Sequence, residues 1–166
     1  MRKSTKWLTT MALSVSVALI LSFIESRIPA FVAIPGVKIG LANIAVIFAL
    51  YKLGIKEAIV VSLIRVFLVS ILFGSPVSLI YSISGAVLSL CTMIIVKKFT
   101  PLTELAVSVL GGVMHNVGQI VAASFMLQTN VVIYYLPFLL LSGTIAGIAI
   151  GVASGILIKK INKIIK

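Results

Sequence analysis

The chain has 166 residues, of which 61% are hydrophobic and only 10% are charged. A soluble domain carries about a quarter charged residues, so this composition excludes an ordinary soluble enzyme and predicts one transmembrane domain over residues 1–166. The net charge is +11, and the basic residues lie between and beyond apolar runs. That placement favours contact with membrane lipid and its anionic headgroups, and it argues against nucleic-acid binding.

Six apolar runs follow one another along the chain, separated by short segments that contain Pro, Gly or Asn. They cover residues 7–24, 39–51, 58–73, 77–96, 105–127 and 131–158. The sixth run is long enough to tilt, or to kink at Pro137. The second run is short: its 13 residues make a helix of about 20 Å, whereas a bilayer core is about 30 Å thick. A re-entrant segment is therefore the alternative to a second span.

The distribution of positive charge decides between these two topologies. With six spans and a cytoplasmic N-terminus, all 14 Lys and Arg residues except Arg27, Lys38 and Arg65 lie on the cytoplasmic side, as the positive-inside rule requires. A re-entrant second run instead places Lys97 and Lys98 outside. The sequence thus predicts an all-α bundle of six transmembrane helices in the cytoplasmic membrane, with both termini in the cytoplasm.

The sixth run contains four glycines at intervals of four residues, which form one stripe along a helix. They are Gly143, Gly147, Gly151 and Gly155. Glycines in register allow the backbone of another helix to approach closely. The stripe either packs against a helix inside the bundle or forms a docking face for another subunit.

Polar residues gather on one side of the fifth run. Gly112, His115, Asn116 and Gln119 fall within an arc of about 100° on a helix. Polar groups at this depth of a membrane are costly unless they meet partners or water. They therefore either make hydrogen bonds between helices or line a ligand pocket.

Arg65 lies in the middle of the third run, where an arginine costs about 2.5–3.5 kcal/mol on insertion scales, so it should face the interior. Glu25, Lys38 and Asn43 lie on the outer side or in the outer half of the membrane. We therefore expect a cavity open to the outside that binds an anionic or strongly polar small molecule. The alternative is a structural pair of Arg65 with Glu25. The candidate substrate-binding residues are Lys38, Asn43, Arg65, His115, Asn116 and Gln119.

Several kinds of chemistry lack the residues that they need in this sequence. The chain has no Asp, one His and one Cys, so neither an Asp-rich diphosphate site nor a metal site can be assembled. No phosphate-binding G-x-x-x-x-G-K-[ST] loop is present. Glu25, Glu57 and Glu104 are scattered over different segments, which leaves no paired carboxylates for acid–base catalysis. We expect no enzyme activity and no cofactor.

Two segments carry a resemblance to a known family. Residues 34–44 read I-P-G-V-K-I-G-L-A-N-I, and residues 111–119 read G-G-V-M-H-N-V-G-Q. Both resemble the family called heptaprenyl diphosphate synthase component I, or the Gx transporter family, over essentially the whole chain. That family is similar to the substrate-binding S components of energy-coupling-factor (ECF) vitamin transporters.

The resemblance implies a six-helix S component that takes a small nutrient from outside. Such a subunit docks on a membrane coupling protein that is driven by two cytoplasmic ATPases. Carried over to this chain, residues 35–43 line the lid and pocket, and Ala12 and Ser16 face the coupling protein. Ser16 departs from the usual alanine there.

The family name implies a different role, as a non-catalytic accessory subunit that presents a lipid substrate to a prenyl diphosphate synthase. A membrane anchor for redox partners is the third class of function that the sequence leaves open.

Overall fold

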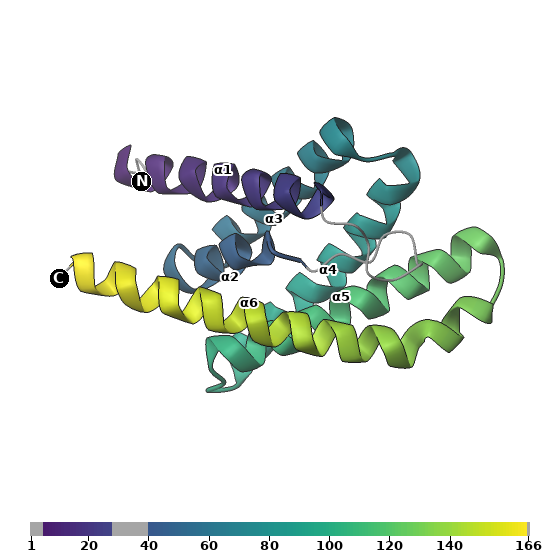
Figure 1. The fold of residues 1–166 in the computed structure, drawn as a ribbon. Coiled ribbons are helices and arrows are strands. Elements are labelled where there is room, and N and C mark those ends of the chain that lie inside the picture. The colour runs from purple at the N-terminus through teal and green to yellow at the C-terminus, as the bar shows by residue number, and fades with distance from the viewer. Residues whose placement is uncertain (1–4, 28–39, 166) are drawn as a thin grey trace.

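The computed structural model describes residues 5–27 and 40–165, and the regular elements in these ranges are all helical. They are α1 (Thr5–Arg27), α2 (Asn43–Lys52), α3 (Ile55–Phe73), α4 (Pro76–Phe99), α5 (Glu104–Leu127), the 3₁₀ turn η1 (Val131–Tyr135) and α6 (Leu136–Ile165). The prediction of an all-α fold is confirmed. Figure 1 shows that α1 and α6 begin and end the chain with both termini at the same end of the bundle.

The turns between the helices follow from local sequence. Ser75 caps α4 in a reciprocal capping box with Ser78, and Pro76 occupies the first turn, where its missing N–H costs nothing. Pro137 falls in the first turn of α6, after η1, rather than in the middle of a long helix. The kink allowed by the sequence is therefore replaced by a helix start, which is the position that proline prefers.

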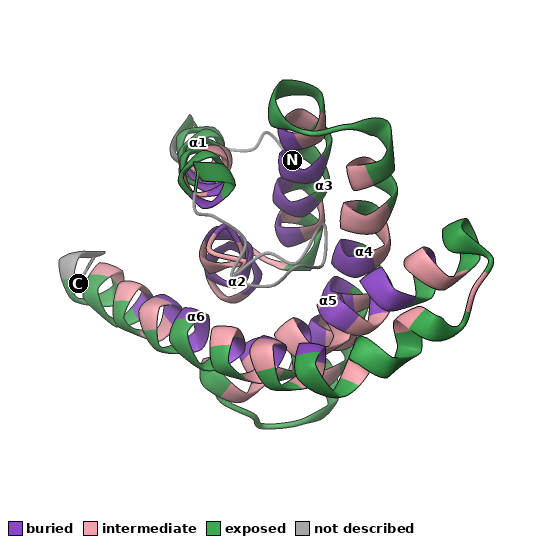
Figure 2. Cartoon of the chain, turned by 45° about the vertical axis from the view of Figure 1, so that its right-hand side comes forward, coloured by how far each residue is buried: buried purple, intermediate pink, exposed green. Residues whose placement is uncertain are grey.

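Helix α2 lies at the centre of the fold and packs against α1, α3 and α6. Its residues 45–50 are all buried, as expected for a helix that is apolar all round. It has 10 residues and is about 15 Å long, roughly half the thickness of a bilayer core. Figure 2 shows that buried residues concentrate where helices face one another, whereas the outer faces are exposed.

Within the part of the chain that the structure describes, four helical stretches are long and apolar enough to cross a membrane. They are Trp7–Arg27, Pro76–Phe99, Glu104–Leu127 and Val131–Lys163. Helix α3 is 19 residues long but carries Lys56, Glu57 and Arg65, and α2 is short. The chain is thus a multi-pass membrane protein, and crossings by α2 and α3 stay a prediction.

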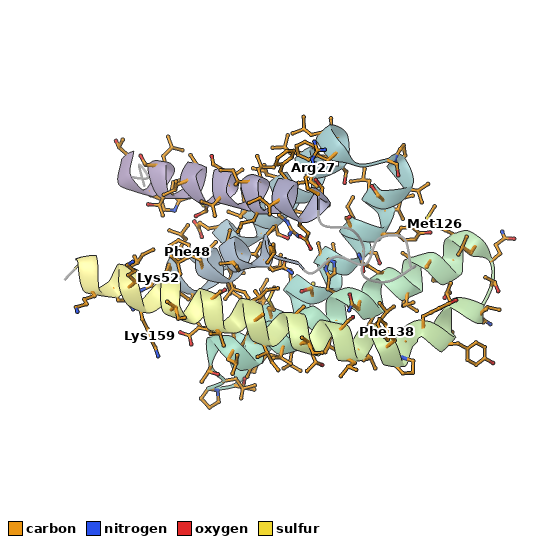
Figure 3. All side chains as sticks on the ribbon, in the orientation of Figure 1. Arg27, Phe48, Lys52, Met126, Phe138 and Lys159 are labelled. Carbon is orange, nitrogen blue, oxygen red and sulfur yellow. The ribbon has the colours of Figure 1, made fainter. Side chains whose placement is uncertain are left out.

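Basic residues gather at the end of the bundle that holds both termini. Figure 3 shows Lys52 and Lys159 at this end and Met126 at the opposite end. This one-sided charge is what the positive-inside rule produces. The assignment of that end to the cytoplasm remains a prediction.

Glycines set the spacing between α5 and α6. A Cβ added at Gly143 would lie 2.8 Å from the carbonyl oxygen of Gly112, and one at Gly147 would lie 2.6 Å from Cα of Val109. Gly151 likewise meets the α5 backbone, with 2.8 Å to Cα of Leu105. Three glycines of the stripe thus pack inside the bundle.

Gly155, the fourth glycine of the stripe, differs from the other three. A Cβ there would meet nothing within 4 Å among the described residues. The close contact between α5 and α6 therefore ends before the last glycine of the stripe.

Candidate functional site

A small polar cavity lies where five helices meet. It has a volume of about 30 Å³, which holds about two water molecules. Residues of α1, α3, α4 and α5 line it together with the first residue of α2 and one residue of the turn before it. The lining residues are Ser22, Glu25, Gly40, Asn43, Arg65, Val66, Val69, Ser82 and His115.

Arg65 dominates the charge of this cavity. Its side chain is only 8% exposed, and within the part of the chain that the structure describes its Nε has no hydrogen-bond acceptor. A buried guanidinium has five N–H donors, and each one that lacks an acceptor costs free energy. The cavity therefore favours an occupant that supplies acceptor atoms.

Glu25 joins the end of α1 to the start of α2. Its carboxylate accepts a hydrogen bond from the backbone N–H of Gly40, and its charge acts on Arg65. Gly40 has a φ of +81°, which glycine adopts at little cost, and its carbonyl accepts from the N–H of Asn43 at 2.8 Å. This turn places the Asn43 side chain on the cavity wall.

The structure brings together three of the six candidate substrate-binding residues: Asn43, Arg65 and His115. Asn116 is 4% exposed and points toward α6 instead, where its Nδ2 donates to the carbonyl of Leu139 at 2.6 Å. Of the two alternatives given in the sequence analysis, Asn116 thus makes a hydrogen bond between helices rather than lining the ligand cavity.

Of the other two candidates, only Gln119 is described by the structure, and it is not among the described residues that line the cavity. Gln119 is buried against α4, because a Cβ added at Gly85 would lie 3.0 Å from its Cγ. Lys38 lies outside the described residues.

Two cavity residues on α1 and one on α4 were not among the candidates: Ser22, Glu25 and Ser82. Ser22 and Glu25 are three residues apart and share a helix face. The sequence signal that could have identified them is their spacing. Ser22 and Glu25 lie one and two helical turns beyond Ala18 on the face of α1 that also buries Ser14.

The opposite face of α1 carries Ala12 and Ser16, the candidate partner-docking residues, and both are exposed. Large apolar side chains on the same helix are exposed as well, including Leu13 at 62% and Ile20 at 58%. This face is therefore available to lipid or to a partner helix.

A family model called heptaprenyl diphosphate synthase component I matches residues 14–157, which is most of the chain. This chain belongs to that family. The comparison with curated proteins and the comparison with solved structures found no match.

The family describes a non-catalytic component of a synthase, so it agrees with the expectation that this chain is not an enzyme. A component implies other subunits as partners. The family thus supports a membrane-associated accessory subunit.

Proposed function

We propose that this protein is a substrate-binding membrane subunit that holds the anionic group of a small molecule at Arg65. The observation that carries the proposal is the 8% exposed Arg65 side chain, which lines a cavity together with Asn43 and His115. A carboxylate or phosphate offers the guanidinium bidentate, charge-assisted hydrogen bonds.

The competing account makes Glu25 the structural partner of Arg65. Glu25 already accepts the Gly40 N–H, and Arg65 Nε still lacks an acceptor among the described residues. One carboxylate thus leaves the donors of Arg65 incompletely satisfied, which favours an anion as a second partner.

The size of the cavity restricts what enters it. Ligand pockets generally have volumes of about 300–1,000 Å³, whereas this cavity has about 30 Å³. We therefore propose that the charged group of the ligand occupies the cavity and that the rest of the ligand lies beyond it.

A transport role follows if the binding subunit works with an energy-coupling module. The sequence lacks a phosphate-binding loop of its own, so ATP-driven uptake requires a partner that hydrolyses ATP, such as a membrane coupling protein with its two ATPases. The exposed small residues Ala12 and Ser16 offer a face for close helix contact, in the manner of an ECF S component. The second candidate is an accessory subunit of a prenyl diphosphate synthase, which the family description favours.

Native mass spectrometry of the purified protein tests ligand binding. We expect a co-purified anionic small molecule in the unchanged protein and its loss in Arg65→Gln, because the variant lacks the charge-assisted hydrogen bonds of the guanidinium. Binding should weaken by tenfold or more, which corresponds to about 1.4 kcal/mol. Arg27→Gln is the matched control: it removes the same charge from an exposed arginine that stacks on Phe23 at 5.0 Å. Equal occupancy in both variants contradicts the proposal.

Co-expression separates the two candidate functions. The protein is purified after co-expression with an energy-coupling module and, separately, with the catalytic subunit of a prenyl synthase. Retention of the module, reduced by Ala12→Leu and unaffected by Ala149→Leu at an exposed small residue of α6, supports transport. Retention of the synthase alone supports the accessory role.

A further inference from the structure

An apolar groove runs along the outer surface between α3 and α4. It has a volume of about 330 Å³, at the lower end of the range of ligand pockets. All of its walls are hydrocarbon side chains. They are Leu63, Ile64, Val66, Phe67, Ile83 and Ala86.

The groove adjoins the Arg65 cavity, because Val66 lines both. Helix α3 supplies Arg65 to the cavity and the neighbouring Ile64 to the groove. Helix α4 likewise supplies Ser82 to the cavity and Ile83 to the groove. A polar and an apolar compartment thus lie next to each other between the same two helices.

The packing of the helices is consistent with access from the side. Helix α4 packs far more extensively against α5 than against α3. The side chains on the groove are also exposed, with Phe67 at 56% and Leu63 at 47%. If α3 crosses the bilayer beside α4, as the sequence predicts, a molecule in the bilayer can reach the groove without crossing water.

We propose that the ligand is an anionic amphiphile with a single hydrocarbon chain, whose head binds Arg65 and whose chain lies in the groove past Val66. The inference rests on the proposed function and names its substrate class. The cavity has room for a small head and no more, while the adjoining groove has about ten times its volume and only apolar lining residues. Charge complementarity at Arg65 selects the head, and a groove between only two helices selects one chain rather than two.

The head and the chain make separate contributions to binding. Apolar chains gain little by moving from lipid to an apolar groove, since both are hydrocarbon. The chain instead concentrates the ligand in the bilayer beside the groove, and fitting side chains add packing contacts. We therefore expect chain and head to be required together.

Isothermal titration of the full chain in phosphatidylcholine nanodiscs tests this with three probes: inorganic phosphate, dodecyl phosphate and dodecanol. We expect dodecyl phosphate to bind at least tenfold more tightly than phosphate, and dodecanol not to displace it. Ile83→Trp should fill the groove and weaken dodecyl phosphate at least tenfold while leaving phosphate unchanged. Ile80→Trp is the matched control, since Ile80 is 47% and Ile83 is 41% exposed on the same helix and only Ile83 lines the groove.

The outcomes distinguish failure of the groove inference from failure of the proposed anion-binding function. If Arg65→Gln weakens both phosphates but Ile83→Trp weakens neither, the groove does not hold the chain and only the proposed function survives. If Arg65→Gln and Arg65→Lys both fold and change neither affinity, both proposals fail. If phosphatidic acid in the nanodisc displaces dodecyl phosphate at equal mole fraction, the site takes a two-chain lipid and the single-chain inference is overturned.

Discussion

The contact between α5 and α6 permits a quantitative test with two glycines of one stripe. In Gly147→Ala the new methyl would lie 2.6 Å from Cα of Val109 and 3.0 Å from the carbonyl oxygen of Ser108. Both are backbone atoms, which cannot rotate away, so the two helices must separate. Overpacking of this kind costs about 1–3 kcal/mol.

Gly155→Ala is the matched control, because its methyl meets nothing within 4 Å among the described residues. Both substitutions gain the same helix propensity, about 0.5–1 kcal/mol, so that gain cancels in the comparison. We expect Gly147→Ala to be less stable than Gly155→Ala by about 1–3 kcal/mol.

The assay is thermal or denaturant unfolding of the two variants in the same detergent, followed by tryptophan fluorescence and size-exclusion chromatography. Gly155→Ala should unfold at or slightly above the temperature of the unchanged protein. If Gly155→Ala is destabilised as much as Gly147→Ala, the steric explanation is refuted.

Three further perturbations test other parts of the fold. Asn116→Leu should lower stability by about 0.5–1.5 kcal/mol, because the bond from Asn116 to the Leu139 carbonyl at 2.6 Å is lost while the Ser142 hydroxyl still donates to that carbonyl at 3.0 Å; an unchanged melting temperature contradicts this. Lys97→Met should destabilise the bundle more than Lys98→Met, because only the Lys97 ammonium bonds the carbonyl of Leu50 at the end of α2. In a background without the native cysteine, a cysteine at position 75 should react with an impermeant maleimide from outside, and one at position 98 should not; the reverse pattern refutes the proposed orientation.

The sequence predicted the helices well because composition alone restricts them. In a membrane each long apolar run must satisfy its backbone within one helix, so runs such as 77–96 and 105–127 became α4 and α5 with small changes at their ends. The second run was the hardest to assign. Its helix α2 is only 10 residues long and buried among the others, and burial by neighbouring helices cannot be read from one segment.

The candidate site was predicted less completely, and the reason lies in the position of α5. Residues 115 and 116 are about 100° apart around a helix, so His115 faces the cavity and α4 while Asn116 faces α6. The sequence grouped them in one arc, which assumes one neighbour. Because α5 lies between two helices, its polar arc is divided between them.

The same arrangement bears on how ligand binding could be communicated within the bundle. Helix α5 packs extensively against both α4 and α6, with glycines at the closest contacts, whereas the described residues of α1 pack mainly on α2 and α3. The cavity lies at the seam, since Arg65 and Glu25 belong to the looser group and His115 to the tighter one. An anion held by both Arg65 and His115 therefore stabilises one relative placement of the two groups, by an amount set by its differential affinity. Because Ala12 lies on α1, we expect ligand binding to change the docking of a partner there even though the two sites do not touch.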